Sequence, residues 1–257
     1  INYDNTEIDT GSTPASQIIE FTSSEGTKFE VLKSQFIWSK VSLNRGLFPT
    51  AGQSQAFALQ LAIPGSSITY AKATYRHKYF KPLFGGKIIF GVRGEIGILE
   101  PYGDTNIAPF FEHFYAGGIS SVRGFKQNTL GPRATPSLYY VGSDGQPVLD
   151  EEGNPVANPY AYYDNDRSIG GAYLLEAGFD LIFKLPFIED QRSMRTSLFV
   201  DIGNVFSKDC GNELININCS ELDLAELRYS YGIGATWITQ LGPMSVAISK
   251  PTNGPLG

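Results

Sequence analysis

Apolar side chains alternate with polar or small side chains along much of this chain, and Gly, Pro, Asn or Asp residues bound each alternating segment. In residues 173–185 every odd-numbered side chain is apolar, and the opposite row contains Glu176, Asp180 and Lys184. Because successive side chains of a strand point to opposite faces, this period predicts strands with one apolar face. No segment of the chain shows a convincing helical pattern. The alternation predicts nine strands, at 33–43, 54–63, 68–80, 87–99, 108–116, 173–185, 194–206, 227–237 and 244–250. Residues 1–32 are more polar and predict a strand end and a long loop.

Two all-β architectures produce such alternation: a soluble sandwich, and a transmembrane barrel with an apolar outer face and a polar lumen. The predicted strands reach the roughly 9–11 residues that a tilted strand needs to cross a bilayer, whereas soluble strands are commonest at about 5–6 residues. Short turns at one rim and long loops at the other are typical of outer-membrane barrels. The short connections are 64–67, 82–86, 186–192 and 239–242, and the long ones are 117–171, 207–223, 44–53 and 100–107. We therefore expect an antiparallel up-and-down transmembrane β-barrel.

Charged residues fall on the polar rows of these strands. A charge facing lipid at mid-depth costs about 2–4 kcal/mol, so the polar rows should face the lumen. The side chains assigned to the lumen in this way are Arg93, Glu95, Glu176, Asp180, Arg195, Asp201 and Arg228. Most of them are expected to be solvated. Asp180 and Asp201 differ because they lie mid-strand on neighbouring hairpin strands, where two carboxylates could hold one guanidinium by charge-assisted hydrogen bonds.

A loop rich in glycine follows the aromatic residues 110–115. Gly117 and Gly118 are followed by the sequence Ser121-Val122-Arg123-Gly124-Phe125. Paired glycines favour a tight reversal of the backbone, so this loop should fold back and present the single cation Arg123.

Composition and charge exclude several classes of function. A net charge of −6 argues against nucleic acid as a partner, because phosphate-binding surfaces need clustered Lys and Arg. The two histidines, His77 and His113, have no Ser or Asp placed beside them by spacing, so general-base chemistry is not expected. The sequence predicts no enzyme, no cofactor and no metal site.

The two cysteines, Cys210 and Cys219, lie in a polar segment rich in Asn. This spacing favours a disulfide that closes a surface loop in an oxidising compartment over the alternative of two unpaired thiols.

Several motifs resemble the BamA family of outer-membrane assembly factors, in a superfamily that also contains two-partner secretion transporters and organelle import barrels. The family's signature loop is matched by Gly117, Gly118 and the residues from Ser121 through Val122, Arg123 and Gly124 to Phe125. In the same order, Asn44–Thr50 resembles a strand-ending turn of the family, Phe199–Gly203 a late strand, and Arg228–Pro251 its final meander. The resemblance covers residues 33–251.

The resemblance implies a barrel of sixteen strands in the outer membrane of a Gram-negative bacterium, preceded by periplasmic POTRA domains. It further implies that the signature loop folds into the lumen, where Arg123 meets acidic residues at the positions of Asp180 and Asp201. The chain lacks a POTRA-like repeat and stops after a strand resembling the fifteenth. We therefore expect about nine strands of a partial barrel in residues 1–251, with loops at 117–171 and 207–223 and a tail at 252–257.

The implied function is the assembly and insertion of β-barrel proteins into the outer membrane. The implied partners are the outer-membrane lipid bilayer, accessory lipoproteins of the assembly machinery (the BAM complex) and unfolded outer-membrane proteins as substrates. The alternative within the same superfamily is a two-partner secretion channel or a passive transport pore.

Overall fold

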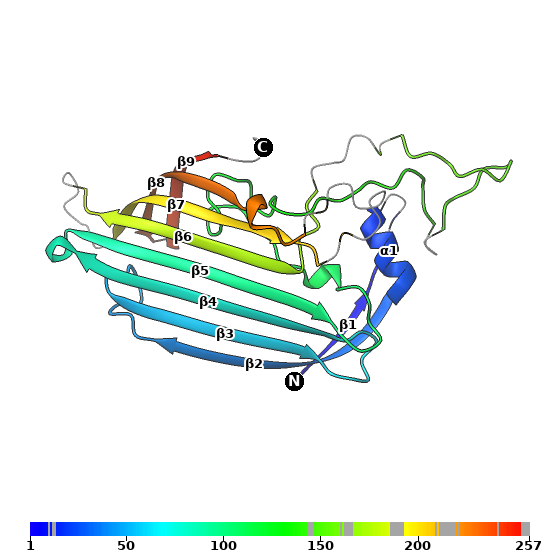
Figure 1. The fold of residues 1–257 in the computed structure, drawn as a ribbon, viewed down its shortest axis with the longest axis horizontal. Helices are drawn as coiled ribbons and strands as arrows, with labels where there is room; N and C mark the ends of the chain where they lie inside the picture. Colours follow the sequence, from blue (N-terminus) through cyan, green and yellow to red (C-terminus); the bar gives the residue numbers. More distant parts are fainter. Residues whose placement is uncertain are drawn as a thin grey trace.

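Nine strands form one antiparallel sheet, and each strand pairs with its neighbour in the sequence (Figure 1). This computed structural model describes residues 1–9, 11, 14–142, 146–159, 161, 167–185, 193–208, 210, 219, 221–240 and 242–252. The strands are β1 (Asn2–Glu7), β2 (Lys28–Val41), β3 (Gly52–Ala62), β4 (Tyr70–Leu83), β5 (Ile88–Pro101), β6 (Tyr173–Phe183), β7 (Met194–Phe206), β8 (Arg228–Thr239) and β9 (Gly242–Pro251). The predicted all-β antiparallel fold is confirmed, and the sheet is open, with β1 and β9 as its edges.

The predicted strand at 108–116 is wrong. In its place the structure has a short 3₁₀ helix, η2 (Phe110–Glu112), followed by isolated bridges at Phe114 and Ala116. Pro109 precedes this helix and has no N–H for a ladder, and the rings of Phe110 and Phe111 both pack against the buried core. Two successive side chains on one side of the backbone are incompatible with a strand.

The expectation that the chain has no helix is also wrong. Residues 16–25 form the helix α1 (Ser16–Glu25), within a region that the sequence predicted as a loop. The helix is mostly polar, and its Phe21 ring lies 5.6 Å from Phe29 and 5.4 Å from Phe110. Packing of Phe21, together with the hydrogen bonds that Gln17 and Glu25 make with the long loop, holds the helix in place.

The two ends of the sheet carry different connections. On one end, here called the loop rim, lie the connections 8–27, 63–69, 102–172 and 207–227; on the other, the turn rim, lie 42–51, 84–87, 184–193 and 240–241. The predicted grouping is wrong for two connections, because the short 64–67 lies on the loop rim and the longer 44–53 on the turn rim. Strict up-and-down order decides the rim, whatever the length of the connection. The predicted turn 186–192 lies outside the described residues.

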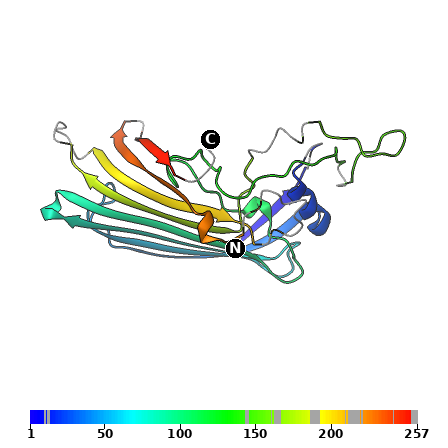
Figure 2. The same cartoon turned by 45° about the horizontal axis from the view of Figure 1, so that its top comes forward.

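The two faces of the sheet differ as the alternation predicts. Leu181, Leu198 and Val200 on the outer face are 44%, 50% and 45% exposed, whereas Phe199 and Asp201 on the inner face are 3% and 0% exposed. Figure 2 shows the sheet curled into a trough, and Gly124 of the β5–β6 loop lies against β8 and β9 on the concave side. Among the described residues, no helix is long and apolar enough to cross a membrane.

Candidate functional site

Arg123 lies at the tip of the loop segment that reaches the inner face of the sheet. Its Nε and Nη2 atoms donate to Asp201 Oδ2 and Oδ1 at 2.6 and 2.8 Å, and its backbone N–H donates to Asp201 Oδ2 at 3.0 Å. Its Nη1 atom donates to Asp180 Oδ1 at 3.1 Å. Two parallel N–H···O bonds between a guanidinium and a carboxylate fix both the distance and the orientation of the pair.

An aromatic ring supports the same guanidinium from below. The central carbon of the Arg123 guanidinium lies 3.5 Å from the ring centroid of Phe199, which stands between Ser197 and Asp201 on the inner row of β7. Planar stacking of this kind is available to arginine and not to lysine. Asp180 is in turn fixed by Ser197, whose hydroxyl donates to Asp180 Oδ1 at 2.9 Å.

A second arginine completes the site, and the sequence did not single it out beyond assigning it to the lumen. Arg93 of β5 donates to Asp201 Oδ1 at 2.7 Å, and to the carbonyl oxygens of Ser120 and Ser121 at 2.9 and 2.6 Å. It therefore binds both the wall and the backbone of the loop. The role of Arg93 could have been suspected from Gly178, its neighbour on the adjacent strand, because an inward glycine leaves room for a long side chain.

Glycines on the inner wall shape the seat of the loop. A Cβ at Gly178 would lie 2.4 Å from Arg93 Nε and 2.8 Å from Asp201 Oδ1, and a Cβ at Gly203 would lie 2.9 Å from Val122 Cγ2. Val122 itself is 1% exposed. Gly178 and Gly203 therefore leave room on the wall for Arg93 and Val122.

The loop backbone is held by its own glycines and by Ser121. Gly117, Gly118 and Gly124 have φ angles of 102°, 105° and 97°, which side chains rarely tolerate. The Ser121 hydroxyl accepts from the N–H of Gly117 at 2.8 Å and donates to Glu176 Oε1 on β6. The structure thus brings together Arg123, Asp180 and Asp201, while Phe125 packs against the buried core.

A second contact holds the start of the same loop at the loop rim. Glu112 accepts from Lys33 at 2.6 Å, from the Tyr70 hydroxyl at 2.9 Å and from Lys72 at 3.2 Å. Burial alone would raise the pKa of the Glu112 carboxyl, but the two ammonium groups and the hydroxyl outweigh burial, so this pKa is lowered. The carboxylate is therefore the form that the fold favours.

Replacing Glu112 with glutamine in the full-length protein should destabilise the loop by about 1–2 kcal/mol, because the lysines lose a charged acceptor. The lowered pKa of Glu112 means that its stabilisation is complete above the unfolded value near 4.3 and is lost as the pH falls through the folded value. Denaturant unfolding of both proteins should show a difference at pH 7 that shrinks below about pH 4. Glu7→Gln is the matched control, because the pair of Glu7 with Lys28 is largely exposed. Equal stability of Glu112→Gln and wild type at pH 7 would contradict the prediction.

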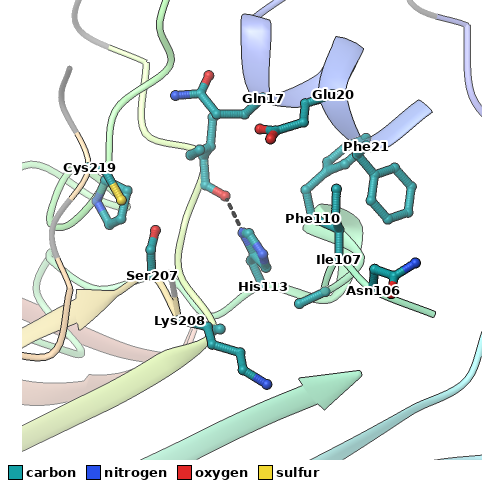
Figure 3. A pocket seen from close by; sticks show the side chains of 14 residues that line it. Gln17, Glu20, Phe21, Asn106, Ile107, Phe110, His113, Ser207, Lys208 and Cys219 are labelled. Atoms are coloured by element: carbon teal, nitrogen blue, oxygen red, sulfur yellow. Dashed lines mark hydrogen bonds between the residues drawn. The ribbon is translucent and has the colours of Figure 1, made fainter. Parts of the chain in front are cut away.

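His113 connects the two ends of the long loop. Its Nδ1–H donates to the carbonyl oxygen of Ile169 at 2.9 Å, and burial lowers the pKa of its imidazole. Figure 3 shows this bond at the wall of a cavity of about 210 Å³, whose lining includes Gln17 and Phe21 of α1 and Lys208. His77 lies on β4 with its ring 6.4 Å from that of Tyr75. Cys210 and Cys219 are joined by a disulfide.

The open antiparallel sheet, with apolar outer rows and a loop seated on its inner face, has the features of part of a transmembrane β-barrel. A family model described as the Omp85 superfamily domain matches residues 1–256. The chain belongs to the Omp85 superfamily, and its place is the outer membrane.

Two known proteins show how the chain relates to BamA. It is 33% identical over 228 residues to the outer membrane protein assembly factor BamA of Neisseria meningitidis serogroup B, an alignment that covers 83% of this chain and 25% of that protein. The crystal structure of BamA from Haemophilus ducreyi lacking POTRA domains 1-3 matches with a TM-score of 0.74 at 26% identity, covering 91% of this chain and 44% of that one. The chain thus spans about a quarter of the length of the first relative and under half of the second.

Proposed function

We propose that this chain is the barrel portion of a factor that assembles and inserts β-barrel proteins into the outer membrane. The observation that carries the proposal is the forked contact of Arg123 with Asp201, made by a loop of the BamA type in a chain similar to BamA. Its substrates would be unfolded outer-membrane proteins, and its partners the lipid bilayer, accessory lipoproteins and POTRA domains of the full-length protein. In this proposal the protein performs no covalent chemistry.

The contact between Arg123 and the two aspartates acts as a clamp that pins the loop inside the lumen. The role of the clamp is structural. The connection between β5 and β6 is 71 residues long, 102–172, and the clamp fixes it at Arg123, about a third of the way along, so that the loop supports the inner wall. Asp201 is fully buried, so its charge needs partners, and Arg123 and Arg93 supply them. Insertion itself would take place at strand edges, where unpaired backbone groups can pair with an incoming strand.

Charge reversal tests the clamp. Arg123→Glu in the full-length protein should place a third carboxylate beside Asp180 and Asp201, at a cost of about 3–5 kcal/mol to the seated loop. We expect faster proteolysis of the loop and fewer folded outer-membrane proteins, measured by their heat-modifiable migration on gels. Adding Asp201→Lys should partly restore both, limited by Arg93.

Arg76→Glu is the matched control, because Arg76 also lies on the inner face, its ion pair among the described residues is with Glu95, and its side chain is 63% exposed. If Arg123→Glu leaves the protease resistance of the loop and the yield of folded proteins at the wild-type level, the clamp proposal fails. The assembly function has a separate test: depletion of the full-length protein must lower the yield of folded outer-membrane proteins. A normal yield, together with a large and stable conductance in planar bilayers, would indicate a transport pore.

A further inference from the structure

The turn between β2 and β3 is closed by one of its own side chains. Asn44 Oδ1 accepts from the N–H groups of Thr50 and Ala51 at 3.0 and 3.1 Å, and Asn44 Nδ2 donates to the Thr50 hydroxyl at 2.8 Å. The conformation of the segment from Asn44 to Thr50 is therefore set locally, by its own side chain.

Within this unit, Phe48 has a φ angle of 47°. A left-handed conformation at a large side chain costs about 1–3 kcal/mol and persists where the surroundings impose it. Closure by Asn44 accounts for the shape of the turn, but it does not explain a Phe at the strained position. The surroundings of its side chain supply the reason.

The turn contacts a strand that is not its neighbour. Nη2 of Arg195, at the start of β7, donates to the carbonyl oxygen of Pro49 at 3.1 Å, and the Arg195 guanidinium lies 6.0 Å from the ring of Phe48. The register runs across the sheet from Gly52 to Phe80, Gly91, Asp180 and Phe199, so β4, β5 and β6 separate the turn from β7. Four strand spacings amount to about 19 Å along the wall. The turn therefore leaves the wall and reaches across the trough.

Phe80 of β4 extends over β5 and contacts Arg195 from the side of the intervening strands. Its ring centroid lies 4.7 Å from the Arg195 guanidinium, and its ring lies above Gly91, where a Cβ would be 3.1 Å from the ring. A side chain at Gly91 would displace this ring. The direct contacts of Arg195 among the described residues are the carbonyl of Pro49 and the rings of Phe48 and Phe80, and the Asp180 carboxylate attracts it without an ion-pair contact.

We propose that Arg195 is a latch that holds the β2–β3 turn across the turn-rim end of the lumen. With the turn latched, the lumen is closed at this end by residues 44–51, just as the loop around Arg123 occupies it from the loop rim. A cavity of about 250 Å³ is lined by residues of both contacts, namely Arg93, Arg123 and Asp180 of the Arg123 site and Phe80 and Arg195 of the latch. The proposal depends on the fold and goes beyond the assembly function.

The turn contains its own reporter, because Arg45 is exposed and trypsin can cut the chain after it. Protease cleavage requires local release of the backbone, so its rate follows the population of the undocked turn. In the full-length protein, Arg195→Ala should raise the rate of cleavage between Arg45 and Gly46 about tenfold, the effect of losing one charge-assisted hydrogen bond. Arg195→Lys keeps the charge without the planar fork and should give an intermediate rate. Sequencing of the new N-terminus identifies the cut.

Arg76→Ala is the control, because it removes an inner-face arginine that does not touch the turn. Equal cleavage rates in wild type and Arg195→Ala overturn the proposal, as does an equal acceleration in Arg76→Ala. If Arg195→Ala fails to fold, Phe80→Leu replaces it: the hydrogen bond to Pro49 stays and the supporting ring is lost. Phe80→Leu should accelerate cleavage about two- to fivefold, and an unchanged rate in that variant also overturns the proposal.

Discussion

Replacing Asp201 with alanine should destabilise the full-length protein by about 3–5 kcal/mol, because it leaves two guanidinium groups facing each other without a shared counter-charge. Asp201 accepts from Arg93 Nη2 and from the N–H, Nε and Nη2 of Arg123 at distances between 2.6 and 3.0 Å. Unfolding in denaturant, followed by heat-modifiable migration, measures the loss. Proteolysis of the loop should accelerate in parallel.

Asp180→Ala is the matched control for this prediction. Asp180 accepts one bond from Arg123, at 3.1 Å, and one from Ser197, so its removal should cost clearly less than the removal of Asp201. Asp201→Asn should fall between the two, since the amide keeps the shape but loses the charge. Equal losses for Asp180→Ala and Asp201→Ala would show that Asp201 is not the centre of the site.

The second large effect is expected at Gly178. A Cβ there would lie 2.4 Å from Arg93 Nε and 2.8 Å from Asp201 Oδ1, so Gly178→Ala must push Arg93 away from Asp201, Ser120 and Ser121. Overpacking of this kind costs about 1–3 kcal/mol. The same unfolding measurement applies, and the loop should become more sensitive to protease although no loop residue has changed.

Gly234→Ala provides the comparison for Gly178→Ala. Gly234 is also an inward glycine, but a Cβ there would meet its nearest atom, the Val246 carbonyl oxygen, at 3.6 Å, an ordinary contact. This variant should be close to wild type in stability. If the two alanine variants behave alike, the bare wall at Gly178 is not needed for the path of Arg93.

The strands could be predicted because their order is local. The two-residue period of residues 173–185 is imposed by lipid on one face and the lumen on the other, and it survives without knowledge of any partner. The helix α1 had no such signal, because its contacts are with distant segments: Phe21 packs among rings, and Gln17 and Glu25 hydrogen-bond to the long loop. The strand predicted at 108–116 is wrong for the same reason. Phe110 and Phe111 are consecutive, yet both pack against a core formed by distant segments, which no local alternation could indicate.

The site divides in a similar way. The alternation of side chains alone predicted that Asp180 and Asp201 face the lumen, and the resemblance to the BamA family implied Arg123 as their partner. The role of these three residues as a clamp remains a prediction. Arg93 could be assigned to the lumen but not to Asp201, because that contact depends on the register that sets it opposite Gly178. The contact of Arg195 with Pro49 spans 146 positions of sequence and three intervening strands, and no local pattern encodes such a distance.

Arg93 determines whether the Asp201 carboxylate keeps a counter-charge when the loop is withdrawn from the inner wall. Because Arg93 belongs to the wall and binds Asp201 independently of Arg123, withdrawal of the loop leaves the buried Asp201 paired, while Asp180 loses its ion pair. The vacated seat then holds one arginine against two carboxylates, and this excess negative charge attracts Arg123 back to it. Arg93 therefore keeps the most buried carboxylate paired while the wall folds, and docking of the loop neutralises the second carboxylate.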